Sequence, residues 1–367
     1  MPPTTPYDYA EPLDPTAVLT DFTLMVDLSR MTADWWAAVN TTQGRRGRAF
    51  KDDGVTELAC DWIDFDSVGK TGWLRVKFSG SLTDKNDNTI RIYPPNTANS
   101  VQLSNAAFGS DNAYDADWRW YTPGHDLVNR IDSGESMVQD ASATSSISTD
   151  GKTSGSLYYD GVGSSSLAYA EYAHGSDLNT AADVTLMAWT KFTSKVASEN
   201  SYPFRLAESR TSITNAIYSR VDPSGDRWRC QIRQIGSPNQ ISNLYTTTAL
   251  SGFDGAWSHL AIHNDGTGQA VLFNGVQEDS AGGFDPLYAG LDTLTLLDAV
   301  IGEQWAGEYQ FHNAKRSQQW IAHEHDQTNH QATFWGTWTH AALPVEETEI
   351  AGTGRDVSRA RRISRIR

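Results

Sequence analysis

The carboxylates are the first residues to test for chemistry, because hydrolysis of a glycosidic bond needs two of them on either side of that bond. The sequence holds no Glu-x-Asp-x-Glu pattern, which would place acidic groups along one face of a strand. Glu346, Glu347 and Glu349 lie close together, but their spacing does not fit and their segment reads as a tail. No Gly-x-Ser-x-Gly elbow occurs either. We therefore expect no catalytic residues and no enzyme.

The run His323-Glu324-His325-Asp326, followed by His330, contains residue types that bind zinc. A zinc helix of the His-Glu-x-x-His type needs two histidines four positions apart, so that both lie on one face. His323 and His325 are two positions apart and lie on different faces of a helix. The pattern therefore predicts a polar helix surface and no metal site.

Tryptophans offer another kind of chemistry, because an aromatic face stacks on a pyranose ring. Most of the thirteen should be buried, as large rings usually are. Trp305 lies in Gly302–Gly307, a stretch expected to be a loop between two strands, where recognition residues tend to lie. The predicted ligand-binding residues are Trp305, Gln304 and Trp228; the other tryptophans weighed for this role are Trp118, Trp120, Trp335 and Trp338.

Basic charge gathers in one segment of an acidic chain. The chain carries a net charge of −16, whereas six arginines against one aspartate give residues 355–367 a charge of +5. Three interpretations of this segment stay open: a solvated tail, an arm that docks on an acidic assembly partner, and a nucleic-acid contact. The docking residues of the assembly reading are Arg355, Arg359, Arg361, Arg362, Arg365 and Arg367. The acidic body argues against nucleic acid as the main partner.

Composition indicates a β-rich protein with no membrane segment. The 29 glycines and the many turn-forming polar residues suit short strands, and no long helical period occurs before residue 310. Cys60 and Cys230 are too few and too far apart for a disulfide framework, so both are expected to be free and buried. The first thirty residues lack the basic and apolar regions of a signal peptide, and no apolar run is long enough to span a membrane.

The first hundred residues alternate apolar and polar positions in several short strands. These are Asp21 to Leu28, Phe50 to Leu58 with an Asp53-Gly54 turn, Thr71 to Lys77, and Ile90 to Asn96. Met31 to Val39 is expected to form a short helix capped by Thr32, with Trp35 and Trp36 facing inward. The strand motifs resemble a small β-rich domain of unknown function that often precedes laminin-G-like domains in bacterial, archaeal and viral proteins. That resemblance concerns the scaffold and implies no activity.

The second part contains a strand pair, Trp257 to His263 and Val271 to Gly275, that ends in a tight Asn274-Gly275 turn. Val184 to Phe192 is apolar at nearly every position, as a strand buried on both faces would be. Together with Ser156 to Gly161 and Ile301 to Ile321, these patterns resemble laminin-G-like, concanavalin A-like jelly rolls. Ser317 is expected to cap a closing helix, Gln318 to Thr328.

The laminin-G-like resemblance also implies a calcium site on a rim loop, because some of these domains bind calcium there. Asp160, Asp183 and Asp254 are the candidate ligands, since each lies at an expected strand end and calcium prefers hard oxygen ligands. Turn formation alone also explains aspartates at these positions. No cofactor is required by the sequence, and Ca²⁺ is the one that it allows.

We predict an all-β chain with a small N-terminal β module at 1–98, a linker at 99–114, a jelly-roll sandwich at 115–335 and a tail with a basic arm at 336–367. The predicted function is a non-enzymatic virion structural or recognition protein of a bacterial virus: a capsid decoration, head fibre or tail adhesin. It would be a homo-oligomer, partnered by virion proteins and a host surface glycan. The alternatives are a secreted or cell-surface carbohydrate-binding module, which would be extracellular, and a glycan-cleaving enzyme.

Overall fold

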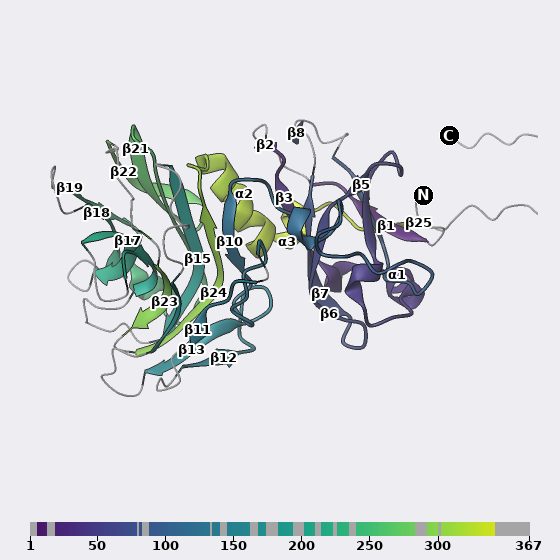
Figure 1. Ribbon diagram of the computed structural model, residues 1–367, viewed down its shortest axis with the longest axis horizontal. Coiled ribbons are helices and arrows are strands. Elements are labelled where there is room, and N and C mark those ends of the chain that lie inside the picture. The colour runs from purple at the N-terminus through teal and green to yellow at the C-terminus, as the bar shows by residue number, and fades with distance from the viewer. Residues whose placement is uncertain are drawn as a thin grey trace, which may run out of the picture.

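Two β-rich parts lie side by side, with helix α2 (Gln318–Asn329) between them (Figure 1). The structure is a computed structural model that describes residues 6–12, 19–78, 81–82, 88–132, 134–139, 145–161, 168–173, 183–193, 202–209, 214–222, 226–234, 240–282, 291, 293–299 and 302–341. Within these residues, no helix is both long and apolar enough to cross a membrane.

The N-terminal part consists of three small antiparallel sheets. The largest has the strand order β25 (Thr339–Ala341), β1 (Tyr7–Ala10), β9 (Ile90–Tyr93), β4 (Arg48–Lys51), β5 (Glu57–Leu58). The second has the order β3 (Thr23–Asp27), β7 (Thr71–Lys77), β6 (Cys60–Asp66), and the third pairs β2 (Leu19–Thr20) with β8 (Ser81–Leu82). Strands lie in the segments where the sequence predicted them, but the first four residues of β3 are all buried, so its two faces are both covered.

Helix α1 (Ala33–Ala38) begins and packs as its sequence predicts. The Thr32 hydroxyl accepts a hydrogen bond from the Trp35 backbone N–H, 3.2 Å away, which satisfies a free donor of the first turn. Trp35 and Trp36 are both buried. Buried Asp8 holds Thr32 in turn, by accepting hydrogen bonds from its backbone N–H and its hydroxyl.

The second part is a sandwich of two antiparallel sheets. The inner sheet, which lies next to α2, has the order β12 (Ser145–Ser148), β13 (Ser156–Gly161), β24 (Gly302–His312), β15 (Val184–Thr193), β20 (Ser258–Asn264), β21 (Gly268–Phe273), β22 (Val276–Gly282), and β10 (Trp118–Thr122) also pairs with β24. The outer sheet has the order β11 (Val138–Gln139), β14 (Ala168–Ala173), β23 (Thr293–Ala299), β16 (Tyr202–Ala207), β17 (Asn215–Asp222), β18 (Arg227–Gln234), β19 (Gln240–Tyr245).

Apolar side chains from both sheets fill the space between them. Leu186, Ala188 and Leu260 of the inner sheet share this core with Phe204 and Ile217 of the outer sheet. The expected β20–β21 pair and its following turn are confirmed: Asn274 and Gly275 both have positive φ, 49° and 79°, as a tight turn requires. The all-β architecture and the two free, buried cysteines are confirmed as well.

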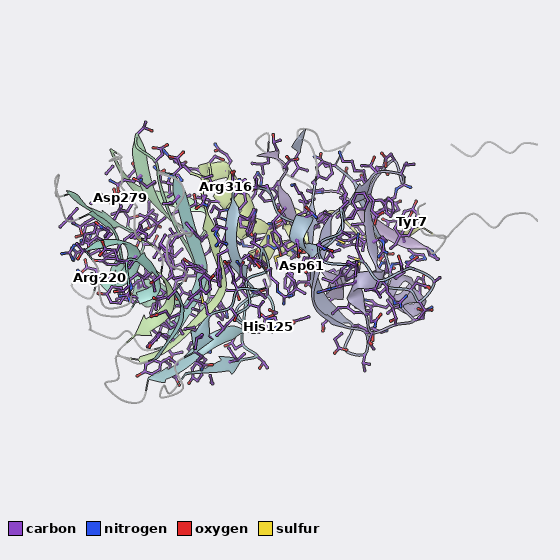
Figure 2. All side chains as sticks on the ribbon, in the orientation of Figure 1. Tyr7, Asp61, His125, Arg220, Asp279 and Arg316 are labelled. Carbon is purple, nitrogen blue, oxygen red and sulfur yellow. The ribbon has the colours of Figure 1, made fainter. Side chains whose placement is uncertain are left out.

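On the opposite face of the inner sheet, here called the interface face, α2 and the N-terminal part cover the region around Met187 and Ala261. Met187, Ala261 and Leu272 project from it into one continuous apolar cluster with Trp320 and Ile321 of α2 and with strands β3 and β7. Polar contacts also join the parts: His125 Nε2 lies 2.9 Å from Asp64 Oδ1, and Figure 2 shows His125 where the parts meet. Strand β15 is therefore buried on both faces, as expected.

The chain after α2 returns to the N-terminal part. Helix α3 (Gln331–Phe334) follows, then Trp335 and Trp338 are buried, and β25 pairs with β1. Residues 336–341 thus complete the N-terminal sheet, although the sequence favoured a tail from 336 onward. Tyr114 of the expected linker is also buried, and its hydroxyl donates to Asp61 over 2.9 Å. The domain bounds given above stay a prediction.

Candidate functional site

Three side chains form a row across neighbouring strands of the inner sheet, on the interface face. The register pairs Tyr158 of β13 with Trp305 of β24, and Trp305 with Lys191 of β15. The rings of Tyr158 and Trp305 lie 4.7 Å apart at 33°, and the Lys191 ammonium lies 4.2 Å from the Trp305 ring centroid. Their chain neighbours Leu157, Tyr159 and Ala306 point into the core, because side chains alternate along a strand.

Polar groups border this row. Asp150 accepts from the Lys191 ammonium and, over 3.1 Å, from the indole N–H of Trp257. Glu303 accepts from the Tyr158 hydroxyl over 3.1 Å. We call these six residues, Asp150, Tyr158, Lys191, Trp257, Glu303 and Trp305, the Trp305 surface. It combines aromatic faces with hydrogen-bonding groups, the composition of a site for a polyhydroxylated ring.

Asp150 keeps its charge on this surface. Burial acts to raise the pKa of Asp150, but hydrogen bonds from Lys191 and Trp257 outweigh it and hold that pKa below its ordinary value. Asp150 is therefore ionised at neutral pH and available as an acceptor, and its side chain is 46% exposed. The Lys191 side chain is 13% exposed and covers Trp305, which is itself 9% exposed.

Of the three residues predicted to bind a ligand, Trp305 alone lies on this surface. Its expected loop is wrong, because Trp305 lies inside β24, where it pairs with Tyr158 and Lys191. Gln304, one residue earlier, pairs with Tyr159 and Phe192 and so lies on the opposite, core side of the sheet. Trp228 is a correction too: its ring is 2% exposed, within the core between the sheets.

The candidate calcium ligands are spread out. Asp160 lies near the end of β13, with its backbone paired to Glu303, whereas Asp183 precedes β15 and Asp254 follows a short 3-10 helix at Leu250–Phe253. Asp183 and Asp254 are exposed. No cluster of metal-ligating atoms includes Asp183 or Asp254 among the residues that the structure describes. The calcium site stays a prediction, as does the docking role of the six arginines of 355–367, which lie outside the described residues.

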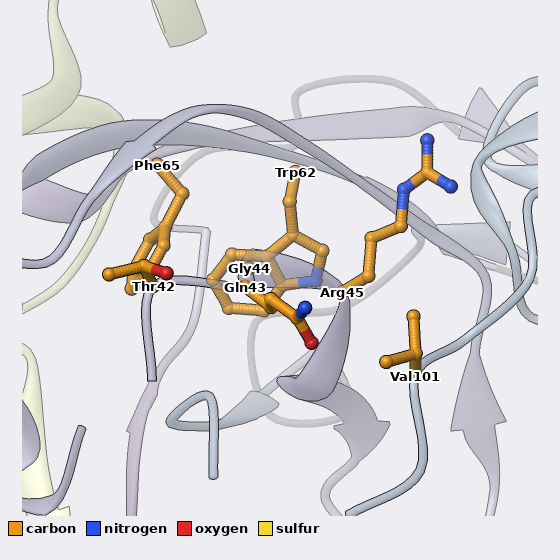
Figure 3. A pocket seen from close by; sticks show the side chains of 7 residues that line it. All are labelled: Thr42, Gln43, Gly44, Arg45, Trp62, Phe65 and Val101. Atoms are coloured by element: carbon orange, nitrogen blue, oxygen red, sulfur yellow. The ribbon is translucent and has the colours of Figure 1, made fainter. Parts of the chain in front are cut away.

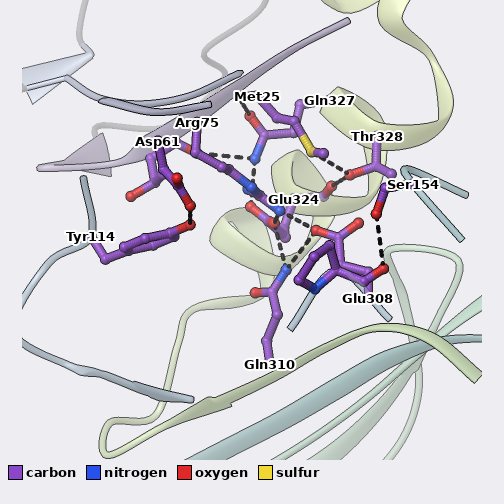
Figure 4. Close-up of polar contacts among 12 residues, drawn as sticks. Met25, Asp61, Arg75, Tyr114, Ser154, Glu308, Gln310, Glu324, Gln327 and Thr328 are labelled. Carbon is purple, nitrogen blue, oxygen red and sulfur yellow. Dashed lines mark hydrogen bonds and ion pairs between the residues drawn. The ribbon is translucent and has the colours of Figure 1, made fainter. Parts of the chain in front are cut away.

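A buried ion cluster joins the two parts (Figure 4). The Arg75 guanidinium of β7 contacts Glu308 of β24 and lies 2.6 Å from Glu324 of α2, and all three side chains are at most 1% exposed. Gln310 donates to Glu324 over 2.7 Å, and the Tyr121 ring lies 4.9 Å from the guanidinium carbon. Sequence reasoning missed this cluster, because Arg75 lies 233 positions before Glu308 in the chain.

The ion cluster predicts a pH dependence of stability. Burial raises the pKa of the Glu308 carboxyl from 4.5 to about 7, against the lowering effect of Arg75. Between these values the folded protein binds more protons than the unfolded chain, so this contribution to stability is lost as pH rises. We expect wild type to lose free energy of unfolding relative to Glu308→Gln as pH rises from 4.5 to about 7.

Urea unfolding of both proteins across this pH range measures the effect. Buried His259 and His312 contribute a pH dependence of the opposite sign, because burial lowers their pKa values. Both proteins contain these histidines, so the contribution cancels in the difference between their free energies of unfolding. Parallel stability curves for the two proteins would contradict the assignment of the proton to Glu308.

Helix α2 corrects a further expectation. The sequence predicted a polar helix surface, but His323, Glu324, His325 and Gln327 are all at most 7% exposed. The helix lies between the two β parts. A helix that packs on one domain exposes its outer face to water, but here the second part covers that face as well. Its start is as predicted: Ser317 accepts a hydrogen bond from the Trp320 backbone N–H over 3.1 Å.

A hollow of about 380 Å³ opens on the N-terminal part (Figure 3). Trp62 and Phe65 form its floor, and the exposed Arg45 lies at its rim. A Cβ on Gly44 would lie 3.0 Å from the Cβ atoms of both aromatic residues, so a glycine keeps this floor open. Such a floor can stack a ring, and a guanidinium can bind a carboxylate.

Comparison with known families matches the second part. Residues 163–322 match the family described as the concanavalin A-like lectin/glucanases superfamily. The chain therefore carries a laminin-G-like, concanavalin A-like domain, preceded by a β-rich region. No curated protein sequence matches the chain.

Solved structures with a similar fold include the botulinum neurotoxin serotype D ligand binding domain in complex with N-acetylneuraminic acid, at 13% identity and a TM-score of 0.44. The binding domain of Paraclostridial Mosquitocidal Protein 1 has 9% identity and a TM-score of 0.45. Each alignment covers 57% of this chain, and 50% and 51% of those chains, so the chain spans about half their length. These likenesses concern the fold alone.

Proposed function

We propose that the concanavalin A-like domain is a carbohydrate-recognition module that binds a glycan at the Trp305 surface. The observation that carries this proposal is the row of Tyr158, Trp305 and Lys191 across three neighbouring strands. Strands position side chains more rigidly than loops do, so the rings of Tyr158 and Trp305 are already in place before a ligand arrives. The matched family, which contains lectins, supports the same function.

The chemistry of the surface suits a pyranose. The apolar face of the sugar would stack on Trp305 in place of the Lys191 ammonium, which now lies 4.2 Å from the ring centroid. A lysine side chain has four rotatable bonds, so the ammonium can move to the edge and donate to a sugar hydroxyl. Asp150 and Glu303, which lie beside the row, would accept hydrogen bonds from other hydroxyls.

Replacing Trp305 with alanine is expected to weaken glycan binding about tenfold or more, because the loss of ring stacking costs about 1.4 kcal/mol. A glycan array identifies the ligand, and titration calorimetry on the strongest hit gives the Kd of each variant. Trp305→Phe keeps a ring and should keep most of the affinity.

Phe108→Ala is the matched control, because Phe108 is 38% exposed and lies outside the Trp305 surface. It should bind as wild type does. If Trp305→Ala binds with wild-type affinity while its thermal unfolding is also unchanged, the site is wrong. An array on which the wild type binds nothing would remove glycan recognition itself.

We propose binding without catalysis. The matched family also contains glucanases, so this needs its own support. Glu308 and Glu324 are an acidic pair that the Arg75 guanidinium brings together, and both are closed off between the two parts, where no polysaccharide reaches them. Hydrolysis of any substrate in a polysaccharide panel, abolished by a single Asp or Glu substitution, would overturn this proposal.

We further propose that the chain serves on the surface of a bacterial virus, as a capsid decoration, head fibre or tail adhesin. Its support is in the sequence: an acidic body with an arginine-rich segment at 355–367, suited to docking on an acidic partner. Mass spectrometry of purified particles tests this role. Absence of the chain from particles would leave the secreted or cell-surface carbohydrate-binding module, which uses the same glycan site.

A further inference from the structure

The end of helix α2 brings two imidazoles and a carboxylate together. The ligand atoms of His325, Asp326 and His330 all lie within 4.8 Å of one another. The sequence analysis considered these residues but rejected a metal site on the spacing of His323 and His325 alone. We propose that these three residues bind a divalent transition metal of the zinc class, independently of the Trp305 surface.

The distances are close to those of a metal site. Asp326 Oδ1 lies 3.0 Å from His325 Nδ1 and 3.0 Å from His330 Nδ1. Ligand atoms about 2.1 Å from one metal are themselves about 3.0 to 3.4 Å apart, depending on geometry. A metal would take the place of the protons that these contacts now share, and the two imidazole ligand atoms lie no more than 4.8 Å apart.

Packing holds the first ligand in position. The His325 ring stacks on Trp189, with centroids 5.4 Å apart at 24°, and is 5% exposed. On another side lies the turn of the β21–β22 hairpin, where a Cβ on Gly275 would lie 3.3 Å from His325 Nδ1. The imidazole of His259 is also buried, and its ring centroid lies 5.9 Å from that of His325.

The other two ligands are open to solvent. The side chains of Asp326 and His330 are 47% and 51% exposed, and both line a hollow of about 240 Å³. A metal can therefore enter, and three protein ligands leave at least one position for water. Two imidazoles and one carboxylate favour Zn²⁺, Ni²⁺, Co²⁺ or Cu²⁺, whereas Ca²⁺ and Mg²⁺ prefer an all-oxygen site.

Titration calorimetry of tag-free, full-length, chelator-treated protein with ZnCl₂ tests the site. We expect saturable binding of one zinc per chain and a higher Tm in its presence, because a ligand bound only by the folded state stabilises it. Asp326→Asn and His330→Ala should each weaken zinc binding at least tenfold. Cobalt provides a separate readout: wild type should acquire the visible absorption of protein-bound Co²⁺, and His330→Ala should lack it.

His125→Asn is the matched control, because His125 also contacts carboxylates, Asp64 and Asp126, at 2.9 and 3.5 Å. It should bind zinc as wild type does. The proposal is overturned if wild type shows no saturable zinc binding, if the Asp326 and His330 variants bind like wild type, or if CaCl₂ competes at equal concentration. If His330→Ala lowers the Tm by the same amount with and without zinc, the contact between His330 and Asp326 serves helix stability alone.

Discussion

Replacing Arg75 with methionine is expected to lower the free energy of unfolding by about 3–5 kcal/mol, because it removes the guanidinium that contacts the two buried carboxylates of Glu308 and Glu324. Glu308 and Glu324 come from β24 and α2, and neither side chain is more than 1% exposed. Without Arg75, one carboxylate must take up a proton or draw water into the interface. The loss of stability should therefore come mainly from weakened contacts between the two β parts.

Chemical denaturation measures this loss, and two further variants interpret it. Arg91→Met is the matched control: Arg91 pairs with the 61%-exposed Asp52 over 3.1 Å, and its loss should cost less than about 1 kcal/mol. The triple variant Arg75→Met, Glu308→Gln, Glu324→Gln should recover much of the stability, because no buried charge is left unpaired. Equal losses for Arg75→Met and Arg91→Met would contradict the cluster's role.

Replacing Trp189 with alanine is expected to cost about 3–5 kcal/mol, the usual loss for deleting a buried aromatic side chain. Its ring is 2% exposed, stacks on His325 and lies 5.1 Å from the His259 ring. The cavity would open between β15 and α2, where the two β parts meet. Residues on both sides would lose contacts together.

Thermal and urea unfolding provide the measurement. Trp189→Phe retains a ring and should lose clearly less. Trp257→Ala is the control, because Trp257 is half-buried and lies on the same interface face. An unchanged Tm for Trp189→Ala would mean that β15 is not covered by α2. If the metal site is as proposed, Trp189→Ala should also weaken zinc binding.

Local elements followed from local sequence. Thr32 and Ser317 were recognisable as helix caps, since a hydroxyl that accepts from the first turn is a short-range interaction. Asn274-Gly275 was recognisable as a tight turn for a similar reason, because positive φ is a property of single residues. The apolar run of Val184 to Phe192 correctly indicated a strand covered on both faces.

The errors concern which face a residue occupies. Trp305 was expected in a loop because glycines flank it, yet pairing on both sides keeps it in β24. Gln304 was grouped with Trp305 as a sequence neighbour, although neighbours in a strand point to opposite faces. Trp228 was judged by ring chemistry, but only the packing of the second sheet shows that it is buried.

By itself, the sequence determined the β-rich class and the N-caps of α1 and α2, since these depend on periodicity and on contacts within a few residues. The concanavalin A-like domain was indicated by the resemblance of its motifs to a known family. Tertiary structure decided what the polar residues do. It placed α2 between two β parts, closed Arg75, Glu308 and Glu324 into one cluster, and brought Tyr158 beside Trp305. The contacts of Arg75 with the two glutamates, and of Tyr158 with Trp305, join residues more than a hundred positions apart. They depend on how whole sheets pack, so no local sequence pattern predicts them.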